Sequence, residues 1–182
     1  MLTPSKSAKA SGAGLSFAIV ASEYNRRYVD AMAQAAKAEL KRGGAGEVLV
    51  VRVPGAFEIP VVAAELSRDG RWAAIVCLGV ILRGETTHAQ HIGEAVTREM
   101  ARLQTSFQVP VIHEVLLLEN EQQARVRCLG KRFNRGAEAG RTALQMAAVM
   151  ADIRERHRAD FEKFLARARK ASRKDKCGEE PC

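Results

Sequence analysis

Four apolar segments separated by helical patterns constrain the fold of this chain more than any other feature. They cover residues 16–22, 47–53, 72–82 and 109–118, and are nearly continuous in Val, Ile and Leu. Unbroken apolar runs are typical of strands covered on both faces, as in parallel sheets. Helical patterns separate the runs at intervals of about thirty residues, which indicates β-α-β units with right-handed crossovers. The sequence therefore predicts a three-layer α/β fold with a four-stranded parallel sheet.

The helical patterns lie between these segments and after the last one. Apolar residues at helical spacing predict helices at 28–42, 58–66, 88–103 and 120–129, and a long one from Asn134 onward. The last helix keeps an apolar face through Phe161, Phe164 and Leu165, whereas the polar residues from Lys170 predict disorder. We therefore expect a flexible leader at 1–14, one domain at 15–155, and a basic helical extension with a disordered tail at 156–182.

The net charge of +8 is spread along the chain, and much of it lies on the expected extensions. We interpret it as a solvated basic surface, with nucleic-acid binding through the tail as the less favoured alternative. Only 5% of the residues are aromatic, which leaves little material for stacking on bases. No apolar run approaches the about 20 residues of a membrane span, and the N-terminus lacks a secretory signal pattern. The four cysteines form no CxxC motif, so we expect a cytoplasmic protein without a disulfide framework.

Polar and aromatic residues follow each apolar segment at its carboxyl end, where open α/β sheets bind ligands. The segments concerned are residues 22–25, 54–58, 83–88 and 118–120. Two interpretations stay open for each notable side chain. Tyr24 either stacks on a flat ring or covers the edge of the core, and Glu58 either pairs with a polar heterocycle or complements a helix dipole. Arg127 belongs either to a solvated basic face or to a phosphate clamp.

The segment GVILRGETTH, residues 79–88, predicts an anion site. It ends an apolar strand, breaks at Arg83-Gly84, and offers Thr86 and Thr87 as helix N-caps. Free N–H groups and the helix dipole at such a junction favour a phosphate or carboxylate. His88 adds a group that can carry a proton near neutral pH. An enzyme acting on a phosphorylated small molecule is the function this combination favours.

Two other chemistries fit the same segment poorly. The spacing of Gly79 and Gly84 is that of a P-loop, but Glu85 follows where a P-loop has Lys. His88 and His91 have the spacing of a metal pair, but a zinc site needs three or four ligands and no third is evident. We therefore expect neither a nucleoside triphosphate site nor a metal, and His91 at the surface or packed on its helix.

Five motifs in chain order resemble the 6,7-dimethyl-8-ribityllumazine synthase family of riboflavin biosynthesis. They are Tyr24-Asn25, PGAFEIP at 54–60, GVILRGETTH at 79–88, ENEQQA at 119–124 followed by Arg127, and NRGAEA at 134–139. The likeness runs from Phe17 to Ala151. Each motif alone is a weak signal, but five in order on the predicted elements form a strong one.

The resemblance implies a flavodoxin-like fold assembled as a homopentamer, or as a capsid of pentamers, with active sites at subunit interfaces. It implies condensation of 5-amino-6-(D-ribitylamino)uracil with 3,4-dihydroxy-2-butanone 4-phosphate, releasing phosphate and water, with no metal or organic cofactor. His88 would transfer protons. The pyrimidine and its ribityl chain would be held by Tyr24, Ala56, Phe57, Glu58, Val80, Ile81, Leu82 and His113. The phosphate substrate would be held by Glu85, Thr86, Arg127 and Arg135, with Arg83, Gly84 and Glu138 in support.

Within this resemblance, His113 and Arg135 would come from the surface of a neighbouring subunit. The family commonly has Phe where this chain has His113 and Lys where it has Arg135. These departures keep a second hypothesis open, namely a catalytically weak flavin- or lumazine-binding assembly. The size of the assembly, the role of the basic tail, and the binding of riboflavin synthase as a partner also stay open.

Overall fold

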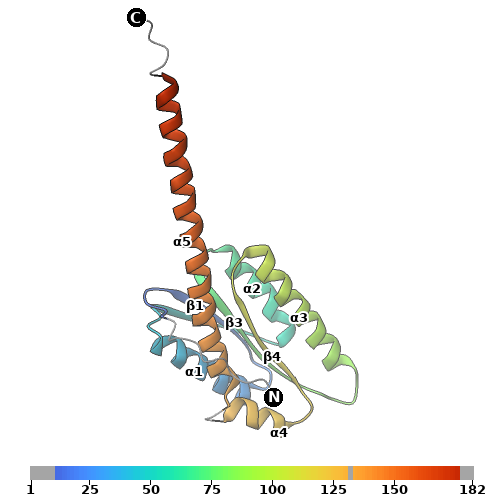
Figure 1. Ribbon diagram of the computed structural model, residues 1–182. Coiled ribbons are helices and arrows are strands. Elements are labelled where there is room, and N and C mark those ends of the chain that lie inside the picture. Colours follow the sequence, from blue (N-terminus) through green and yellow to red (C-terminus); the bar gives the residue numbers. More distant parts are fainter. Residues whose placement is uncertain (1–10, 131–132, 177–182) are drawn as a thin grey trace, which may run out of the picture. The chain divides into compact units, whose positions relative to one another are not determined.

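A computed structural model describes residues 11–130 and 133–176, with residues 167–176 described by their backbone alone (Figure 1). Strands and helices alternate along most of the chain. The strands are β1 (Ser16–Ser22), β2 (Glu47–Val53), β3 (Trp72–Leu82) and β4 (Val111–Leu118). The α-helices are α1 (Arg26–Arg42), α2 (Ile59–Arg68), α3 (His88–Phe107), α4 (Glu121–Ala124) and α5 (Arg135–Lys176). A 3-10 turn, η1 (Ala56–Glu58), precedes α2, and a π-helical turn, η2 (Arg125–Leu129), follows α4.

The four strands form one parallel sheet in the order β2-β1-β3-β4, so β2 and β4 are its edges. This confirms the predicted α/β class, and the first three strands have the predicted bounds. The fourth begins at Val111 rather than at residue 109. Pro110 has no N–H to give to the ladder, and its carbonyl instead accepts the N–H of Ile75 at 2.8 Å.

Helices cover both faces of the sheet (Figure 1). On one face, α1 and the first part of α5 close a core that includes Ile19, Met32 and Ala147. On the other face, α2 and α3 close a second core that includes Ile75 and Met100. Because successive strand residues point to opposite faces, each continuous apolar run supplies side chains to both cores.

Two glycines bring α5 close to α1. A Cβ atom at Gly140 would lie 2.8 Å from the carbonyl oxygen of Ala36, and one at Gly136 would overlap the backbone of Met32. Ordinary Cβ contacts begin at about 3.4 Å, so a residue without a side chain is required at both positions. The NRGAEA motif therefore has a packing reason for its glycine.

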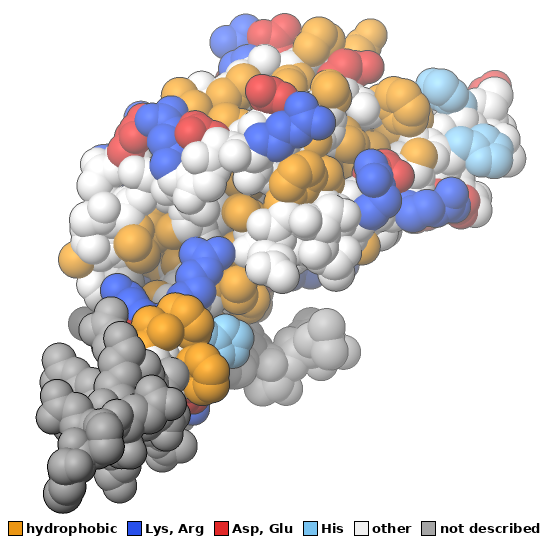
Figure 2. Space-filling view, turned by 90° about the horizontal axis from the view of Figure 1, so that it is seen from above, with side chains coloured by type: hydrophobic (Ala, Val, Ile, Leu, Met, Phe, Trp, Pro, Cys, Tyr) orange, Lys and Arg blue, Asp and Glu red, His pale blue; other side chains and the backbone are white. Residues whose placement is uncertain are grey.

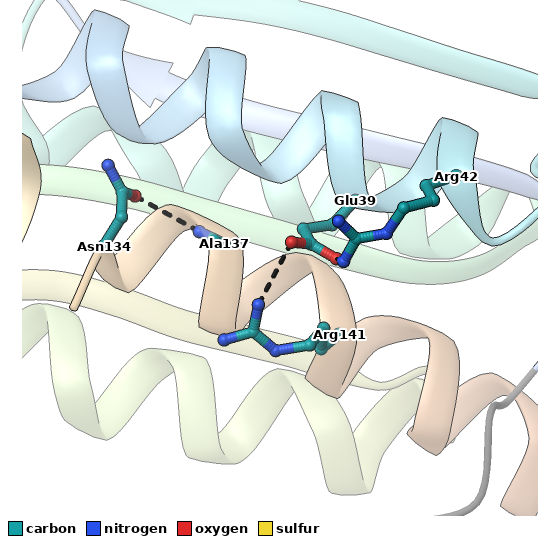
Figure 3. A network of polar contacts seen from close by, with 5 residues as sticks. All are labelled: Glu39, Arg42, Asn134, Ala137 and Arg141. Carbon is teal, nitrogen blue, oxygen red and sulfur yellow. Dashed lines mark hydrogen bonds and ion pairs between the residues drawn. The ribbon is translucent and has the colours of Figure 1, made fainter. Parts of the chain in front are cut away.

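Polar contacts reinforce the same helix pair (Figure 3). Glu39 of α1 accepts a hydrogen bond from Arg141 of α5 at 3.1 Å and pairs with Arg42 as well. Asn134 caps α5, because its Oδ1 accepts the N–H of Ala137 at 3.2 Å. Asn is among the best residues at this position, since its oxygen satisfies an N–H that has no partner within the helix.

Three predicted helices differ from the structure in detail. The helix predicted at 58–66 is η1 followed by α2, with Pro60 in the first turn, where its missing N–H costs no bond. The helix predicted at 120–129 is α4 followed by the wider π-helical turn, and Asn120 caps it by accepting the N–H of Gln123 at 3.0 Å. The helix predicted at 88–103 continues to Phe107 and ends at Gln108, which has a left-handed backbone (φ 52).

The described chain divides into two compact units, with the boundary between Ala148 and Val149. Within the second unit, the apolar side chains of Phe161, Phe164 and Leu165 are exposed. The helix reaches Lys176 and so includes residues 170–176, the start of the stretch for which the sequence predicts disorder. The Ala, Arg and Lys of that stretch are strong helix formers, whereas the prediction weighed only their polarity. Residues 177–182, including Cys177 and Cys182, lie outside the described chain.

Residues 12 and 13, near the end of the predicted leader, contact the turn between α1 and β2. Residues 1–10 lie outside the described chain, but Gly12 donates its N–H to the carbonyl of Gly43 at 2.7 Å. Ala13 forms an antiparallel bridge with Ala45, which ties this segment to the turn between α1 and β2. No helix within residues 11–130 and 133–176 is long and apolar enough to cross a membrane.

Candidate active site

The segment after β1 fixes the carboxyl ends of three strands. Asn25 has a left-handed backbone (φ 55, ψ 38), a conformation that Asn tolerates better than most residues. Its Nδ2 donates to the carbonyl of Val80, near the end of β3, at 2.8 Å. The N–H of Tyr24 donates to the carbonyl of Pro54, just after β2, at 3.2 Å. The edge of the sheet where ligands bind in α/β folds is thereby held together by short, directed bonds.

Two aromatic rings and a carboxylate lie at this edge. Tyr24 is 73% exposed and Phe57 is 60% exposed, although both are large apolar side chains. Gly55 brings Tyr24 and Glu58 together, since a Cβ there would lie 3.5 Å from the Tyr24 ring and 2.7 Å from Glu58 Oε2. Ala56, next in the chain, is buried. The exposure of Tyr24 favours stacking on a flat ring over covering the core.

The connection from β3 to α3 is exposed from Arg83 to His88. Thr86 Oγ1 accepts the N–H of His88 at 3.4 Å, whereas Thr87, at the N-cap position, makes no side-chain capping bond. Of the two predicted caps, Thr86 therefore makes the contact. Arg83 pairs with Glu119 beyond β4 at 2.9 Å. His88 stands exposed in the first turn of α3, where the helix dipole favours an anion.

The other predicted site residues of this connection vary in exposure. Val80 is buried, and Ile81 and Leu82 are half-buried at the end of β3. Gly84 and Glu85 are exposed in the loop. A ligand at this edge would therefore meet mainly the backbone of 80–82 and the N–H groups of the loop.

His113 lies on β4 and faces α3. Its Nδ1 accepts the N–H of Val115 at 3.3 Å, so Nε2 carries the proton and donates to Thr97 Oγ1 on α3 at 2.9 Å. Burial lowers the pKa of the imidazole, although a backbone hydrogen bond opposes the shift. His113 is therefore neutral near pH 7 and held in one orientation.

Glu114, the next residue, points to the opposite face of the sheet. It faces a group of charges from η2 and α5, namely Arg127, Arg135 and Glu138. Arg135 and Glu138 are paired at 2.5 Å. Burial raises the pKa of Glu114 to about 7, a rise opposed by Arg135 and Arg127 and assisted by Glu138. Glu114 was not among the residues predicted from the sequence, although a carboxylate inside the apolar run 109–118 was a signal for it.

A groove of about 600 Å³ runs between α3 and the edge strand β4. It adjoins His113, because Thr97, the hydrogen-bond partner of that histidine, is in its lining. The lining residues are Arg83, Gln90, Gly93, Glu94, Thr97, Arg98, Val115 and Leu117. The groove therefore lies beside an unpaired sheet edge, which is a surface open to a further chain.

The predicted site residues fall on both sides of the sheet. His88 opens α3, which belongs to the core with α2, whereas Arg127, Arg135 and Glu138 belong to elements packed with α1. His113 and Arg135, which the resemblance assigns to one neighbouring surface, lie on opposite faces of β4. His88 and the basic cluster of one chain are thus separated by the sheet.

No group of three or more His, Cys, Asp or Glu with metal-binding geometry occurs among the described residues. His91 is exposed on α3, as expected. On the face seen in Figure 2, basic and acidic side chains are interspersed. Pairs such as Arg68–Glu65 at 3.3 Å and Arg102–Glu99 at 2.7 Å show the same mixing, which is typical of a solvated surface.

Comparison with known proteins decides the family. The family model of 6,7-dimethyl-8-ribityllumazine synthase matches residues 14–151. The chain belongs to the 6,7-dimethyl-8-ribityllumazine synthase family. It is therefore an enzyme, a transferase of riboflavin biosynthesis, as the resemblance implies.

Curated relatives of the same name cover most of the chain. The protein of Stenotrophomonas maltophilia (strain R551-3) is 37% identical over 139 residues, which is 75% of this chain and 90% of the relative. That of Xylella fastidiosa (strain 9a5c) is 40% identical over 140 residues, 76% of this chain and 91% of the relative. That of Xanthomonas campestris pv. campestris (strain B100) is 38% identical over 136 residues, which is 74% of this chain and 88% of the relative.

Lumazine synthases assemble as oligomers. The family match ends at residue 151, close to the boundary between the two units of the chain.

Proposed function

We propose that this lumazine synthase condenses 5-amino-6-(D-ribitylamino)uracil with 3,4-dihydroxy-2-butanone 4-phosphate, releasing phosphate and water. The observation that carries the proposal is the arrangement at the carboxyl edge of the sheet. There, exposed Tyr24 and Phe57 stand beside a helix N-terminus that carries His88. A flat ring and a phosphate need those two kinds of contact, and the same edge offers both.

The pyrimidine stacks on Tyr24 in this proposal. Phe57 adds a second exposed ring, and Glu58 accepts hydrogen bonds from the amino groups of the ring or from the ribityl hydroxyls. The backbone N–H and C=O groups of Ala56 and of residues 80–82 donate and accept hydrogen bonds to this substrate in fixed directions. The bond from Asn25 to Val80 supports this role, because it fixes the end of β3 relative to the loop that carries Tyr24.

The phosphate substrate binds at the N-terminus of α3, beside Glu85 and Thr86. Arg127 and Arg135 of a neighbouring subunit complete the site. This division is supported by the sheet that separates His88 from those arginines within one chain. Two guanidinium groups and a helix N-terminus together fix the phosphate and stabilise it as a leaving group.

His88 moves the protons. The amine attacks the ketone, an imine forms with loss of water, phosphate leaves, and the second amine closes the ring with loss of a second water. Each step transfers a proton, and a positioned histidine typically contributes ~10²–10⁴-fold to such steps. Holding two substrates in reacting geometry supplies much of the remaining acceleration.

The subunits form a homopentamer or a larger assembly of pentamers in this proposal, located in the cytoplasm and able to take riboflavin synthase as a partner. Two buried free thiols, Cys77 and Cys128, are consistent with a reducing compartment.

The lumazine synthase domain in this proposal covers residues 15–155, with 156–182 as an appended extension. Light scattering of the purified protein distinguishes a pentamer from a capsid, and a monomer at micromolar concentration would refute the shared site.

The decisive experiment mixes the purified protein with both substrates and follows the fluorescence of the lumazine product. We expect turnover without added metal or cofactor. No product at high enzyme concentration would refute the proposal. Tight binding of a ribityl-pyrimidine without turnover would instead identify a binding assembly, the alternative that the family comparisons do not favour.

A further inference from the structure

Glu114 is a carboxylate in the middle of an edge strand, on the face that closes the core with α1. Its register partner in β3 is Leu78, which is fully buried, and its neighbours on the same face of β4 are Ile112 and Leu116. Within the described chain the Glu114 carboxylate makes no hydrogen bond or direct ion pair. Burying part of a carboxylate among apolar side chains costs free energy. The charged groups around Glu114 must therefore account for its presence.

Those charges come from two elements. The turn η2 contributes Arg127 and the thiol of Cys128, and α5 contributes Arg135 and Glu138. Arg135 already has a partner in Glu138 at 2.5 Å, whereas exposed Arg127 has no carboxylate partner among the described residues. The Cys128 thiol is uncharged near neutral pH, because burial raises its pKa to about 11. The four charged side chains are those of Glu114, Arg127, Arg135 and Glu138. Their charges therefore sum to zero when Glu114 is ionised and to one positive charge when Glu114 is protonated.

Burial raises the pKa of Glu114 to about 7, and the two arginines limit the rise. The change of charge therefore falls near neutral pH. An anion that approaches Arg127 and Arg135 meets either a competing carboxylate or a neutral acid.

We propose that Glu114 is a positioning residue that sets the anion affinity of Arg127 and Arg135. Ionised, it holds the guanidinium groups by its charge and competes with a bound phosphate. Protonated, it leaves both groups to the anion. This inference rests on the proposed function in one respect, namely that these arginines receive the phosphate of the substrate.

The size of the effect follows from the fraction of protein that is competent to bind. If the anion binds only when Glu114 is protonated, the apparent affinity is the intrinsic affinity times the protonated fraction. With a pKa of about 7, that fraction falls from ~0.9 at pH 6 to ~0.1 at pH 8. Anion affinity should therefore fall about tenfold between these two pH values.

The test measures sulfate binding by titration calorimetry, on the full-length assembled protein, at pH 6 and pH 8. Sulfate is the probe because its charge is constant in this range, whereas a phosphate monoester titrates near pH 6. We expect about tenfold weaker binding at pH 8 for the native protein. Glu114→Gln should bind sulfate more tightly than the native protein at pH 8 and lose most of the tenfold pH dependence, since an amide mimics the protonated acid and His88 is the same in both proteins.

Two further variants control the comparison. Glu65→Gln removes an exposed carboxylate of α2, paired only with Arg68, and should keep the native pH dependence. Arg127→Ala should weaken sulfate binding at both pH values. Circular dichroism and light scattering of each variant check that the fold and the assembly are intact.

A tenfold pH dependence that persists in Glu114→Gln would overturn the inference, as would native binding that does not change with pH or is absent at pH 6. These outcomes concern anion affinity alone. They are separable from the proposed function, which fails only if the native protein forms no lumazine from its two substrates. A merely structural role for Glu114 would change stability without removing the pH dependence of sulfate binding.

Discussion

Replacing Gly136 by Ala tests whether the close contact of α1 and α5 requires a residue without a side chain. A Cβ at Gly136 would overlap the carbonyl oxygen of Met32 and lie 2.5 Å from its carbonyl carbon. Both atoms belong to the backbone of α1, so neither can rotate away. The helices would have to separate by about 1 Å, which forfeits up to about half of the dispersion energy of each contact across the seam.

The matched control is Gly93→Ala, a second glycine inside an α-helix. A Cβ at Gly93 would lie 3.6 Å from Leu117 Cδ2, which is an ordinary contact. Both substitutions gain about 1 kcal/mol of helix propensity. Overpacking against backbone costs up to about 3 kcal/mol, so we expect Gly136→Ala to lose about 2 kcal/mol net and Gly93→Ala to gain up to about 1 kcal/mol.

Thermal unfolding followed by fluorescence of Trp72, the single tryptophan and 3% exposed, measures both variants at equal protein concentration. For a chain of this length, 1 kcal/mol corresponds to about 2–4 °C in Tm. Gly136→Ala should therefore melt about 4–8 °C lower than the native protein, and Gly93→Ala slightly higher. Equal stability of Gly136→Ala and the native protein, or shifts of both variants in the same direction, would refute the packing argument.

Three further outcomes are expected. His88→Ala should lower kcat by ~100-fold or more with little change in either KM, measured by lumazine fluorescence, and a change confined to KM would contradict the proton-transfer role. Arg127→Ala should raise KM for the phosphate substrate by roughly 10–100-fold, as expected for hydrogen bonds to a charged group, whereas Arg125→Ala, an exposed neighbour paired with Glu121, should not. Because the folded-state pKa of Glu114 is raised from 4.5 to about 7, the native protein should lose stability as pH rises through that interval, whereas Glu114→Gln should not. Urea unfolding measures the free energy of unfolding of both proteins at pH 5 and pH 8. Relative to the native protein, Glu114→Gln should be more stable at pH 8 than at pH 5 by roughly 1–3 kcal/mol, and an equal difference at both pH values would contradict the burial of the charge.

Much of the fold could be predicted because its determinants are local. Continuous apolar runs marked all four strands, and three of them have the predicted bounds. The exception is the start of the fourth strand, at 109–111. It depends on the missing N–H of Pro110, which a pattern of hydrophobicity does not reveal. The π-helical turn at 125–129 was equally invisible, because its residues have the same periodicity as an ordinary helix over so short a stretch.

The candidate site divides in the same way. Tyr24, Phe57 and His88 could be singled out from motifs, since each stands next to a recognisable strand end. Their exposure, and the bond from Asn25 that fixes the strand spacing, needed coordinates. Glu114 escaped notice because its importance depends on Arg127, Arg135 and Glu138, which approach it only through the fold.

The sequence by itself determined the α/β architecture, the edge of the sheet that carries the site, and the family. Apolar periodicity and motif order are properties of neighbours along the chain. Only the tertiary structure decided that His88 and Arg127 lie on opposite sides of the sheet, and that Gly136 and Gly140 must be glycine. The reason is that burial, close packing and electrostatic coupling depend on distances between atoms that are remote in sequence, and those distances exist only after the chain has folded.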